Sequence, residues 1–223
     1  MKKFFLYTLH HLIARFALRW ILGIRFHYTE HLSKYPQFIL VGNHNSHLDT
    51  VSILSALPVE IIEKVHPVAA ADYFGTTGKR AFWTRLLVNA ILIPRKRPEK
   101  PGDPDPLLLM EAALERGDSI LLFPEGSRGI PEVIQPFRKG VGHLLKKYPE
   151  IPYIPVYMQG LGRCLPKGRG LLLPLTGEVI FGEPRFCQSE SVDSIVKEVE
   201  FSVKFLDDLI ETRPNWDRME IAQ

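Results

Sequence analysis

Short runs of apolar residues alternate along the chain with longer segments whose apolar positions recur every three or four residues. The short runs are typical of strands buried on both faces, and the longer pattern is typical of helices. The predicted strands are Phe38–Gly42, Pro67–Ala71, Ala90–Ile93, Ile120–Phe123, Tyr153–Tyr157 and Glu178–Phe181. The predicted helices lie near Leu48–Leu57, Arg80–Val88, Leu107–Arg116, Lys139–Tyr148 and Ser191–Glu211. Their alternation predicts an α/β fold with a largely parallel or mixed sheet flanked by helices.

The first 29 residues form a basic and apolar segment in which no acidic residue precedes Glu30. On a helix, one side would carry Phe5, Leu9, Leu12, Ile13, Phe16 and Trp20, with Arg15, Arg19 and Arg25 reaching toward water. The longest uncharged run, residues 4–14, is shorter than the roughly 20 apolar residues that a spanning helix needs.

Two interpretations of this segment stay open, a helix lying in the membrane interface and a first helix packed on the core. The absence of acidic residues favours a membrane that contains anionic lipid. We therefore expect residues 1–29 to form an N-terminal amphipathic, membrane-associated helical segment. Residues 30–223 are then expected to form a single α/β domain, because no linker divides them.

Composition narrows the possible classes of protein. The chain has 223 residues, of which 45% are hydrophobic and 24% charged, as in ordinary globular domains. Two cysteines exclude a disulfide scaffold and a four-cysteine zinc site. A net charge of +3 is too small to indicate nucleic-acid binding.

Polar and charged side chains follow four of the predicted strands. These segments are Asn43–Asp49, Pro94–Arg97, Phe123–Gly129 and Ile154–Val156, the last followed by Gln159 and Gly160. Since reactive groups in open α/β sheets gather at the carboxyl ends of the strands, we expect these segments to form one site.

The first of these segments contains a histidine and an aspartate five residues apart, His44 and Asp49. Across a turn that opens a helix, the carboxylate can fold back onto one ring nitrogen and leave the other to act as a base. A substrate hydroxyl could then attack a carbonyl without any protein nucleophile. The alternative is that Asn43, Ser46 and Asp49 are turn and capping residues beside a histidine with no chemical role.

The other strand ends supply cations and a flexible loop. Arg95, Arg128 and either Arg138 or Lys139 offer the positive groups that suit a phosphate. Glu125 could hold an arginine or accept a substrate hydroxyl, and Gly126 would let a ligand approach the backbone closely. Solvated surface charge is the alternative for each cation.

Together these segments resemble the conserved blocks of the glycerolipid acyltransferases, the PlsC-like family. The resemblance rests on the His-x₄-Asp run at 43–49, Arg95, the Phe-Pro-Glu-Gly-Ser-Arg-Gly run at 123–129, Phe137-Arg138-Lys139-Gly140 and Ile154-Pro155-Val156, in that order. It covers roughly residues 38–183. Two departures are Pro94, where the family often has an acid, and Ala71-Asp72-Tyr73-Phe74, where a lysine is common.

The resemblance implies an enzyme that moves a fatty acyl group from a thioester to a lysophospholipid at a membrane surface. His44 would be the general base and Asp49 its orienting acid. The substrate-binding residues would be Arg95, Glu125, Gly126, Ser127, Arg128, Lys139 and Pro155, with Pro155 on the acyl side. The donor would be acyl-CoA or acyl-acyl carrier protein, with no bound cofactor and no metal, on the cytoplasmic side of a membrane as a peripheral or monotopic protein.

Several alternatives remain. We expect the acceptor to be 1-acyl-sn-glycerol-3-phosphate, which would give phosphatidic acid. The alternatives are that the same site acylates glycerol-3-phosphate or another lysolipid, or that the protein is a silent lipid-binding relative. His44, His47 and Asp49 could instead bind zinc, although further ligands lack obvious spacing. A serine hydrolase at Ser127 is disfavoured because Glu125 stands where a nucleophile elbow needs glycine.

Overall fold

The protein is described here by a computed structural model covering residues 2–71, 82, 86–94, 105–130, 133–165 and 173–211. Its strands are β1 (Ile24–His27), β2 (Ile39–Gly42), β3 (Val65–Ala70), β4 (Ile91–Ile93), β5 (Ser119–Leu122), β6 (Tyr153–Gln159) and β7 (Gly177–Phe181). Its helices and helical turns are α1 (Lys2–Tyr7), η1 (Thr8–Ala14), η2 (Ala17–Ile21), η3 (Thr29–Ser33), α2 (Leu48–Ala56), α5 (Pro106–Glu115), α6 (Gly140–Lys147), α7 (Leu161–Cys164) and α8 (Val192–Glu211).

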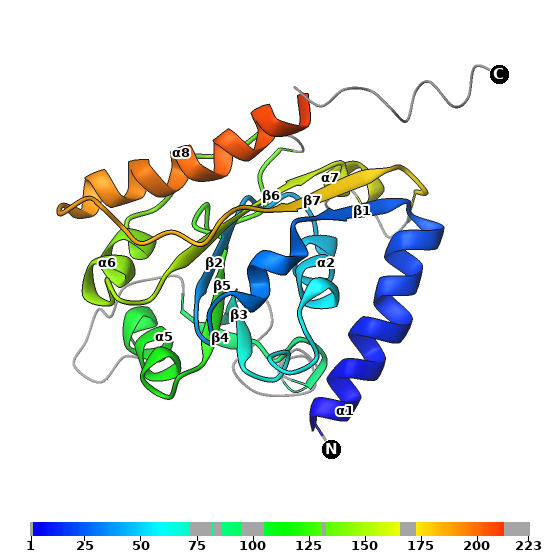
Figure 1. Ribbon diagram of the computed structural model, residues 1–223, viewed down its shortest axis with the longest axis horizontal. Helices are drawn as coiled ribbons and strands as arrows, with labels where there is room; N and C mark the ends of the chain where they lie inside the picture. The colour runs from blue at the N-terminus through cyan, green and yellow to red at the C-terminus, as the bar shows by residue number, and fades with distance from the viewer. Residues whose placement is uncertain are drawn as a thin grey trace.

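The strands form one seven-stranded mixed sheet in the order β1-β7-β6-β2-β5-β3-β4. All neighbouring strands are parallel except β6 and β7, which are antiparallel. The strand β2 is therefore central, with β6 on one side and β5 on the other (Figure 1). The predicted α/β class is confirmed, and the carboxyl ends of β2 and β5 lie next to each other.

The sheet is covered on both faces (Figure 1). Side chains along β2 alternate between two apolar clusters, since Leu40 joins one and Ile39 and Val41 join the other. The first cluster includes residues of α2 and the N-terminal helices, and the second includes residues of α5, α6 and α8. Burial on both faces explains why the strands are apolar throughout.

Local signals in the sequence set the limits of the predicted helix near 107–116. Asp105 accepts a hydrogen bond from the main-chain N–H of Leu107 at 2.8 Å, and Pro106 occupies the first turn. At the other end Gly117 adopts a φ of 81°, and the N–H of Asp118 bonds to the carbonyl of Ala113. The predicted helix is thus confirmed as α5.

The N-terminal helical segment, here residues 2–21, is wider than an α-helix over much of its length. The N–H of Arg15 bonds to the carbonyl of His10, and that of Leu22 to Ala17, each five residues back. Only a narrow side of this segment contacts the core, through Leu6, His10 and Leu18. The predicted N-terminal helix is confirmed, but the strand β1 that follows it was not predicted. Residues 24–27 belong to the sheet and not to the helical segment expected at residues 1–29.

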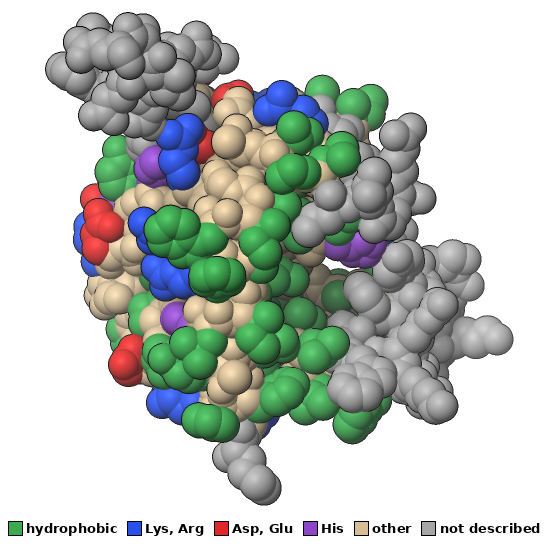
Figure 2. Space-filling view, turned by 90° about the vertical axis from the view of Figure 1, so that its right-hand side faces the viewer, with side chains coloured by type: hydrophobic (Ala, Val, Ile, Leu, Met, Phe, Trp, Pro, Cys, Tyr) green, Lys and Arg blue, Asp and Glu red, His purple; other side chains and the backbone are tan. Residues whose placement is uncertain are grey.

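The apolar stripe expected on this segment faces outward. Large exposed side chains on it are Phe4, Phe5, Leu12, Ile13, Phe16, Trp20 and Ile21, and Trp20 is 73% exposed. Figure 2 views the molecule from this side and shows hydrophobic side chains gathered across it, with basic groups among them. The stripe itself is therefore not packed on the core, although the helix contacts the core on its other side through Leu6 and Leu18. None of the helices in the described ranges is long and apolar enough to cross a membrane.

Three short elements of the structure were not predicted, and one predicted helix lies mostly outside the described residues. The helical turns η3 and α7, like β1, had not been predicted. Of the helix predicted at Arg80–Val88, only residues 82 and 86–88 are described, so most of it lies outside the described residues. The remaining strands and helices agree with the predicted ranges to within one or two residues at most ends.

Candidate functional site

Two hydrogen bonds hold the chain in place where it leaves β2. The side chain of Asn43 accepts a hydrogen bond from the main-chain N–H of Met158 and donates one to its carbonyl, each at 2.8 Å. This pair extends the contact between β2 and β6 beyond the last paired residues, Gly42 and Val156. Since Asn43 directly precedes His44, the sheet itself fixes where the backbone of His44 begins.

A capping box forms the turn that follows. The hydroxyl of Ser46 accepts the N–H of Leu48 at 3.2 Å, and Oδ2 of Asp49 accepts the N–H of Ser46 at 2.8 Å. The same oxygen accepts the N–H of Asn45 at 2.6 Å. The Ser-x-x-Asp pattern at 46–49 could have revealed this motif in the sequence. Asp49 is fully buried at the start of α2, where the helix dipole favours a negative charge.

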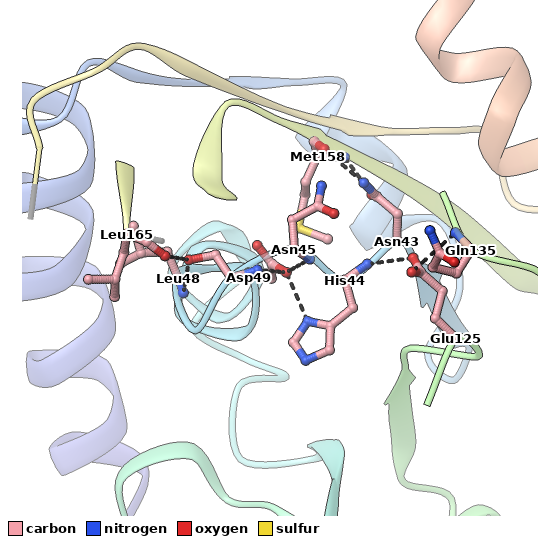
Figure 3. A network of polar contacts seen from close by, with 10 residues as sticks. Asn43, His44, Asn45, Leu48, Asp49, Glu125, Gln135, Met158 and Leu165 are labelled. Carbon is pink, nitrogen blue, oxygen red and sulfur yellow. Dashed lines mark hydrogen bonds and ion pairs between the residues drawn. The ribbon is translucent and has the colours of Figure 1, made fainter. Parts of the chain in front are cut away.

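His44 and Asp49 are in direct contact, as their spacing predicted. Nδ1 of His44 lies 2.8 Å from Oδ2 of Asp49. Because an ionised carboxylate oxygen only accepts, Nδ1 carries the hydrogen, and in the neutral imidazole Nε2 keeps its lone pair. The His44 side chain is 19% exposed, and Figure 3 shows its ring pointing away from the surrounding polar network. The arrangement can present a base to a ligand at the sheet edge.

The segment after β5 holds His44 from the other side (Figure 3). Oε1 of Glu125 accepts the main-chain N–H of His44 at 2.8 Å, and Oε2 accepts the N–H of Gln135 at 3.3 Å. The N–H of Gly129 donates to the carbonyl of His44 at 3.1 Å. Burial raises the pKa of Glu125, and the N–H groups of His44 and Gln135 oppose that rise. The two carboxylate oxygens of Glu125 are thus engaged by main-chain groups.

An aromatic residue of the same segment stacks on the imidazole. The ring centroids of Phe123 and His44 are 4.3 Å apart, and the two planes differ by 13°. The sequence indicated Asn43 only as a turn residue and Phe123 only as part of a motif, because neither residue type is chemically reactive. Their importance depends on which strands are neighbours in the sheet.

The loop after Glu125 brings Arg138 and Arg128 toward the same region. Gly126 has a φ of 74°, and a Cβ built there would lie 2.7 Å from Nε of Arg138. Ser127 is exposed, and Arg128 is partly exposed. Burial lowers the pKa of His47, and the positive charge of Arg128 lowers it further. Arg128 therefore lies close enough to the His44 turn for its charge to act there.

Three predicted residues lie apart from this network or cannot be described. Nζ of Lys139 pairs with Oδ1 of Asp193 at 2.7 Å, between the start of α6 and the start of α8. Pro155 is buried in β6 opposite Val41, and its carbonyl accepts the N–H of Gly182 at 2.8 Å. Arg95 lies outside the described residues.

A metal site receives no support from the arrangement of side chains. Within the part of the chain that the structure describes, no three His, Cys, Asp or Glu residues are grouped to hold a metal ion. His44 already directs Nδ1 at Asp49, and His47 lies at the start of α2. The residues best explained by their geometry are a histidine base, its carboxylate partner and nearby cations.

Comparison with known proteins adds a family and relatives. The family model described as Acyltransferase matches residues 23–159. The 1-acyl-sn-glycerol-3-phosphate acyltransferase alpha of Homo sapiens is 27% identical over 147 residues, covering 63% of this chain and 48% of that protein. The 1-acyl-sn-glycerol-3-phosphate acyltransferase BAT2, chloroplastic, of Brassica napus is 28% identical over 148 residues, covering 66% of this chain and 40% of that protein. The chain thus spans about half the length of these curated relatives, or less.

A solved structure shares the fold. The crystal structure of the 1-acyl-sn-glycerophosphate (LPA) acyltransferase PlsC from Thermotoga maritima matches with a TM-score of 0.76 and 22% sequence identity. The match covers 96% of this chain and 83% of that one. The likeness therefore includes the sheet and its covering helices.

Proposed function

Because the chain belongs to the Acyltransferase family, we propose that it transfers a fatty acyl group from a thioester donor to the hydroxyl of a lysophospholipid. The proposed acceptor is 1-acyl-sn-glycerol-3-phosphate, which would give phosphatidic acid, and the names of the curated relatives support this choice. The observation that carries the proposal is the contact of Nδ1 of His44 with Asp49, which leaves Nε2 as the ring nitrogen that can serve as the base at the carboxyl end of the central strand.

The proposed reaction needs no protein nucleophile. Nε2 of His44 takes the proton of the acceptor hydroxyl while the oxygen attacks the thioester carbonyl. The C–S bond then breaks, the thiolate leaves with the proton returned by the imidazolium, and an ester remains. Asp49 is ionised in this scheme and stabilises the imidazolium through Nδ1. General-base assistance of this kind contributes about 10²- to 10⁴-fold in rate.

The proposed phosphate-binding groups are cations at the same edge of the sheet. The effect of Arg128 on the pKa of His47 supports a position for its charge near the turn that carries His44. Gly126 and Ser127 are proposed to contact the acceptor from the same loop, and Arg95 to add a second guanidinium. The proposed roles of Lys139 in binding and of Pro155 on the acyl side require substrate to reach beyond the His44 network.

The donor is proposed to be acyl-CoA or acyl-acyl carrier protein, with no bound cofactor. The protein is proposed to lie on the cytoplasmic side of a membrane as a peripheral or monotopic protein. The outward apolar stripe of residues 4–21, together with Arg15 and Arg19, supports contact with an anionic lipid surface. This surface would also be the source of the lysolipid.

The proposed function is tested with purified protein in mixed micelles containing anionic lipid. A matrix of labelled acyl-CoA and acyl-acyl carrier protein is combined with 1-acyl-glycerol-3-phosphate, glycerol-3-phosphate and other lysophospholipids. We expect ester formation with wild type, and a loss of at least about 100-fold in His44→Ala. The matched control is His143→Ala, because His143 is an exposed residue of α6.

Each outcome of this assay separates the alternatives. Transfer to glycerol-3-phosphate in preference to the lysolipid would change the acceptor and leave the base in place. Equal rates for wild type and His44→Ala would remove His44 from the reaction. No transfer with any pair of substrates, together with retained lipid binding, would favour the silent lipid-binding protein.

A further inference from the structure

Phe123 lies against one face of the His44 imidazole in a nearly parallel stack. The ring centroids are 4.3 Å apart and the planes differ by 13°. Phe123 follows directly after β5, and its other surroundings include the apolar cluster beneath α2. A Cβ built on Gly42 would lie 3.6 Å from Cε1 of Phe123, an ordinary contact distance, so the Phe123 ring lies beside the end of β2 just before Asn43.

The stack restricts the tilt of the His44 ring, which the contact with Asp49 alone does not fix. The hydrogen bond at Nδ1 fixes one atom of the imidazole, and the ring can still tilt about that point. The Phe123 face sets the plane of the ring, so the two contacts together determine the direction of the Nε2 lone pair. A base must point at the proton that it removes, because misalignment of reacting atoms lowers the rate steeply.

The stack also responds to charge. The face of a benzene ring carries negative electrostatic potential, which attracts a cation more strongly than a neutral group. His44 is neutral before proton transfer and is an imidazolium during it. A contact that strengthens only as the reaction proceeds lowers the barrier without tightening substrate binding. With this stack in place, the His44 side chain is still 19% exposed.

We propose that Phe123 is a positioning residue for the general base, because its ring fixes the plane of the His44 imidazole and stabilises the imidazolium. This inference rests on the proposed function, since it takes His44 as the base. It adds a residue with no reactive group to the machinery of the reaction. The expected effect on kcat of removing the aromatic face is about threefold to thirtyfold.

The first test compares three variants. Phe123→Leu keeps an apolar side chain and removes the aromatic face, while Phe123→Tyr keeps that face. Phe38→Leu is the matched control, because Phe38 is buried in the same apolar cluster but precedes β2 at the opposite end. We expect Phe123→Leu to lower kcat with KM for both substrates within about twofold, and Phe123→Tyr to restore kcat. Phe38→Leu is expected to affect thermal stability and not kcat.

Two further measurements report on position and charge separately. In NMR spectra, ring protons of His44 that lie over the Phe123 face are shifted upfield, and we expect this shift to disappear in Phe123→Leu. Incorporating 3,4,5-trifluorophenylalanine at position 123 weakens the negative face while nearly preserving the ring shape. We expect kcat to fall in that protein with the stack retained. This variant also carries the test if Phe123→Leu fails to fold.

The outcomes distinguish this inference from the function on which it rests. Suppose that His44→Ala is inactive, that Phe123→Leu changes neither kcat nor the His44 signals, and that trifluorophenylalanine at position 123 leaves kcat unchanged. The inference is then overturned and the proposed function stands. If His44→Ala is as active as wild type, the proposed function fails. A fall in kcat of equal size in Phe38→Leu would reduce Phe123 to a general packing role and also overturn the inference.

Discussion

The carboxylate of Glu125 accepts the main-chain N–H of His44 at 2.8 Å, although the two residues are 81 positions apart. The contact joins the ends of β2 and β5, which are neighbours at the centre of the sheet. Glu125 is only 5% exposed, and its other oxygen accepts the N–H of Gln135. Its geometry suits control of the His44 backbone, whereas direct contact of Glu125 with substrate stays a prediction.

Replacing Glu125 by alanine is expected to disturb both the fold and the reaction. Two main-chain N–H groups would lose their acceptor, which costs about 1–3 kcal/mol for a buried group. We expect a lower midpoint of thermal unfolding and a kcat reduced by about tenfold or more, because the His44 backbone would lose its support.

The variant Glu125→Gln retains an amide oxygen for the His44 N–H, so its kcat should lie between those of wild type and Glu125→Ala. The exposed Glu190→Gln is the control and should match wild type in both measurements. A selective rise in acceptor KM, with kcat unchanged, would instead support direct substrate contact by Glu125.

The two functions of Asp49 can be separated by substitution. Asp49→Asn removes the charge that supports an imidazolium but keeps an oxygen for the N–H groups of Asn45 and Ser46. We expect kcat to fall by about 10²- to 10⁴-fold with a smaller effect on KM.

Ser46→Ala is the companion variant, because it breaks the bond from the N–H of Leu48 and the bond that the Ser46 hydroxyl donates to the carbonyl of Leu165, and it leaves the contacts of Asp49 in place. It should lower the free energy of unfolding by about 0.5–2 kcal/mol and leave kcat within a few-fold of wild type. If Ser46→Ala lowered kcat as much as Asp49→Asn, the effect of Asp49 would come from capping alone.

Arg128→Ala is expected to weaken the binding of the acceptor more than the binding of the acyl donor. Loss of a guanidinium beside the phosphate should raise KM for the lysolipid by about tenfold or more, since charge-assisted bonds contribute about 1.5–3 kcal/mol. Arg116→Ala provides the control, because Arg116 pairs with Asp118 before the amino end of β5, away from the site. Steady-state kinetics with both substrates varied would detect the difference. An equal rise in donor KM would place the Arg128 charge on the thioester side.

His47 offers a titration that reports on Arg128 directly. The positive charge of Arg128 lowers the pKa of His47, after the larger effect of burial. Removing that charge in Arg128→Ala should therefore raise the pKa of His47, and Arg128→Lys, which keeps a charge, should raise it less. An NMR titration of the imidazole signals would measure both. An unchanged pKa in Arg128→Ala would show that the guanidinium acts elsewhere.

The outward stripe of the N-terminal helical segment predicts lipid binding that one residue can weaken. Phe16 is 59% exposed there, and Phe201 is 66% exposed on α8, on the other side of the sheet. We expect Phe16→Ser to weaken binding to anionic vesicles by about tenfold, since burying such a side chain contributes about 1.5–3 kcal/mol. Phe201→Ser should bind as wild type in a vesicle flotation assay. Equal losses in both variants would argue against a membrane contact specific to the N-terminal segment.

The sequence predicted the central strands well because burial on both faces makes them apolar throughout. The strand β1 escaped prediction because its four residues, Ile24–His27, are few and directly follow a long apolar helix, although they alternate apolar and polar side chains as a half-buried strand does. Gly23, with a φ of 66°, marks the boundary between them. The antiparallel pairing of β6 with β7 was also out of reach, since a local pattern does not specify the direction of a partner strand.

Within the site, prediction succeeded where chemistry and spacing are local. The contact of His44 with Asp49 spans five residues and follows from a helix-opening turn. The stack of Phe123 on His44 and the bond from Glu125 depend on β2 and β5 being neighbours, which the sequence does not specify. Reactive residue types drew attention to Lys139, whose partner in the structure is Asp193.

The double hydrogen bond of Asn43 with Met158 restricts this position to a single residue type. Of the twenty side chains, only asparagine offers one donor and one acceptor side by side at that reach. An aspartate of identical shape would set an oxygen against the Met158 carbonyl, and a glutamine would be one methylene too long. A change of one atom at this position would therefore break the contact between β2 and β6 at the point where the reactive turn begins.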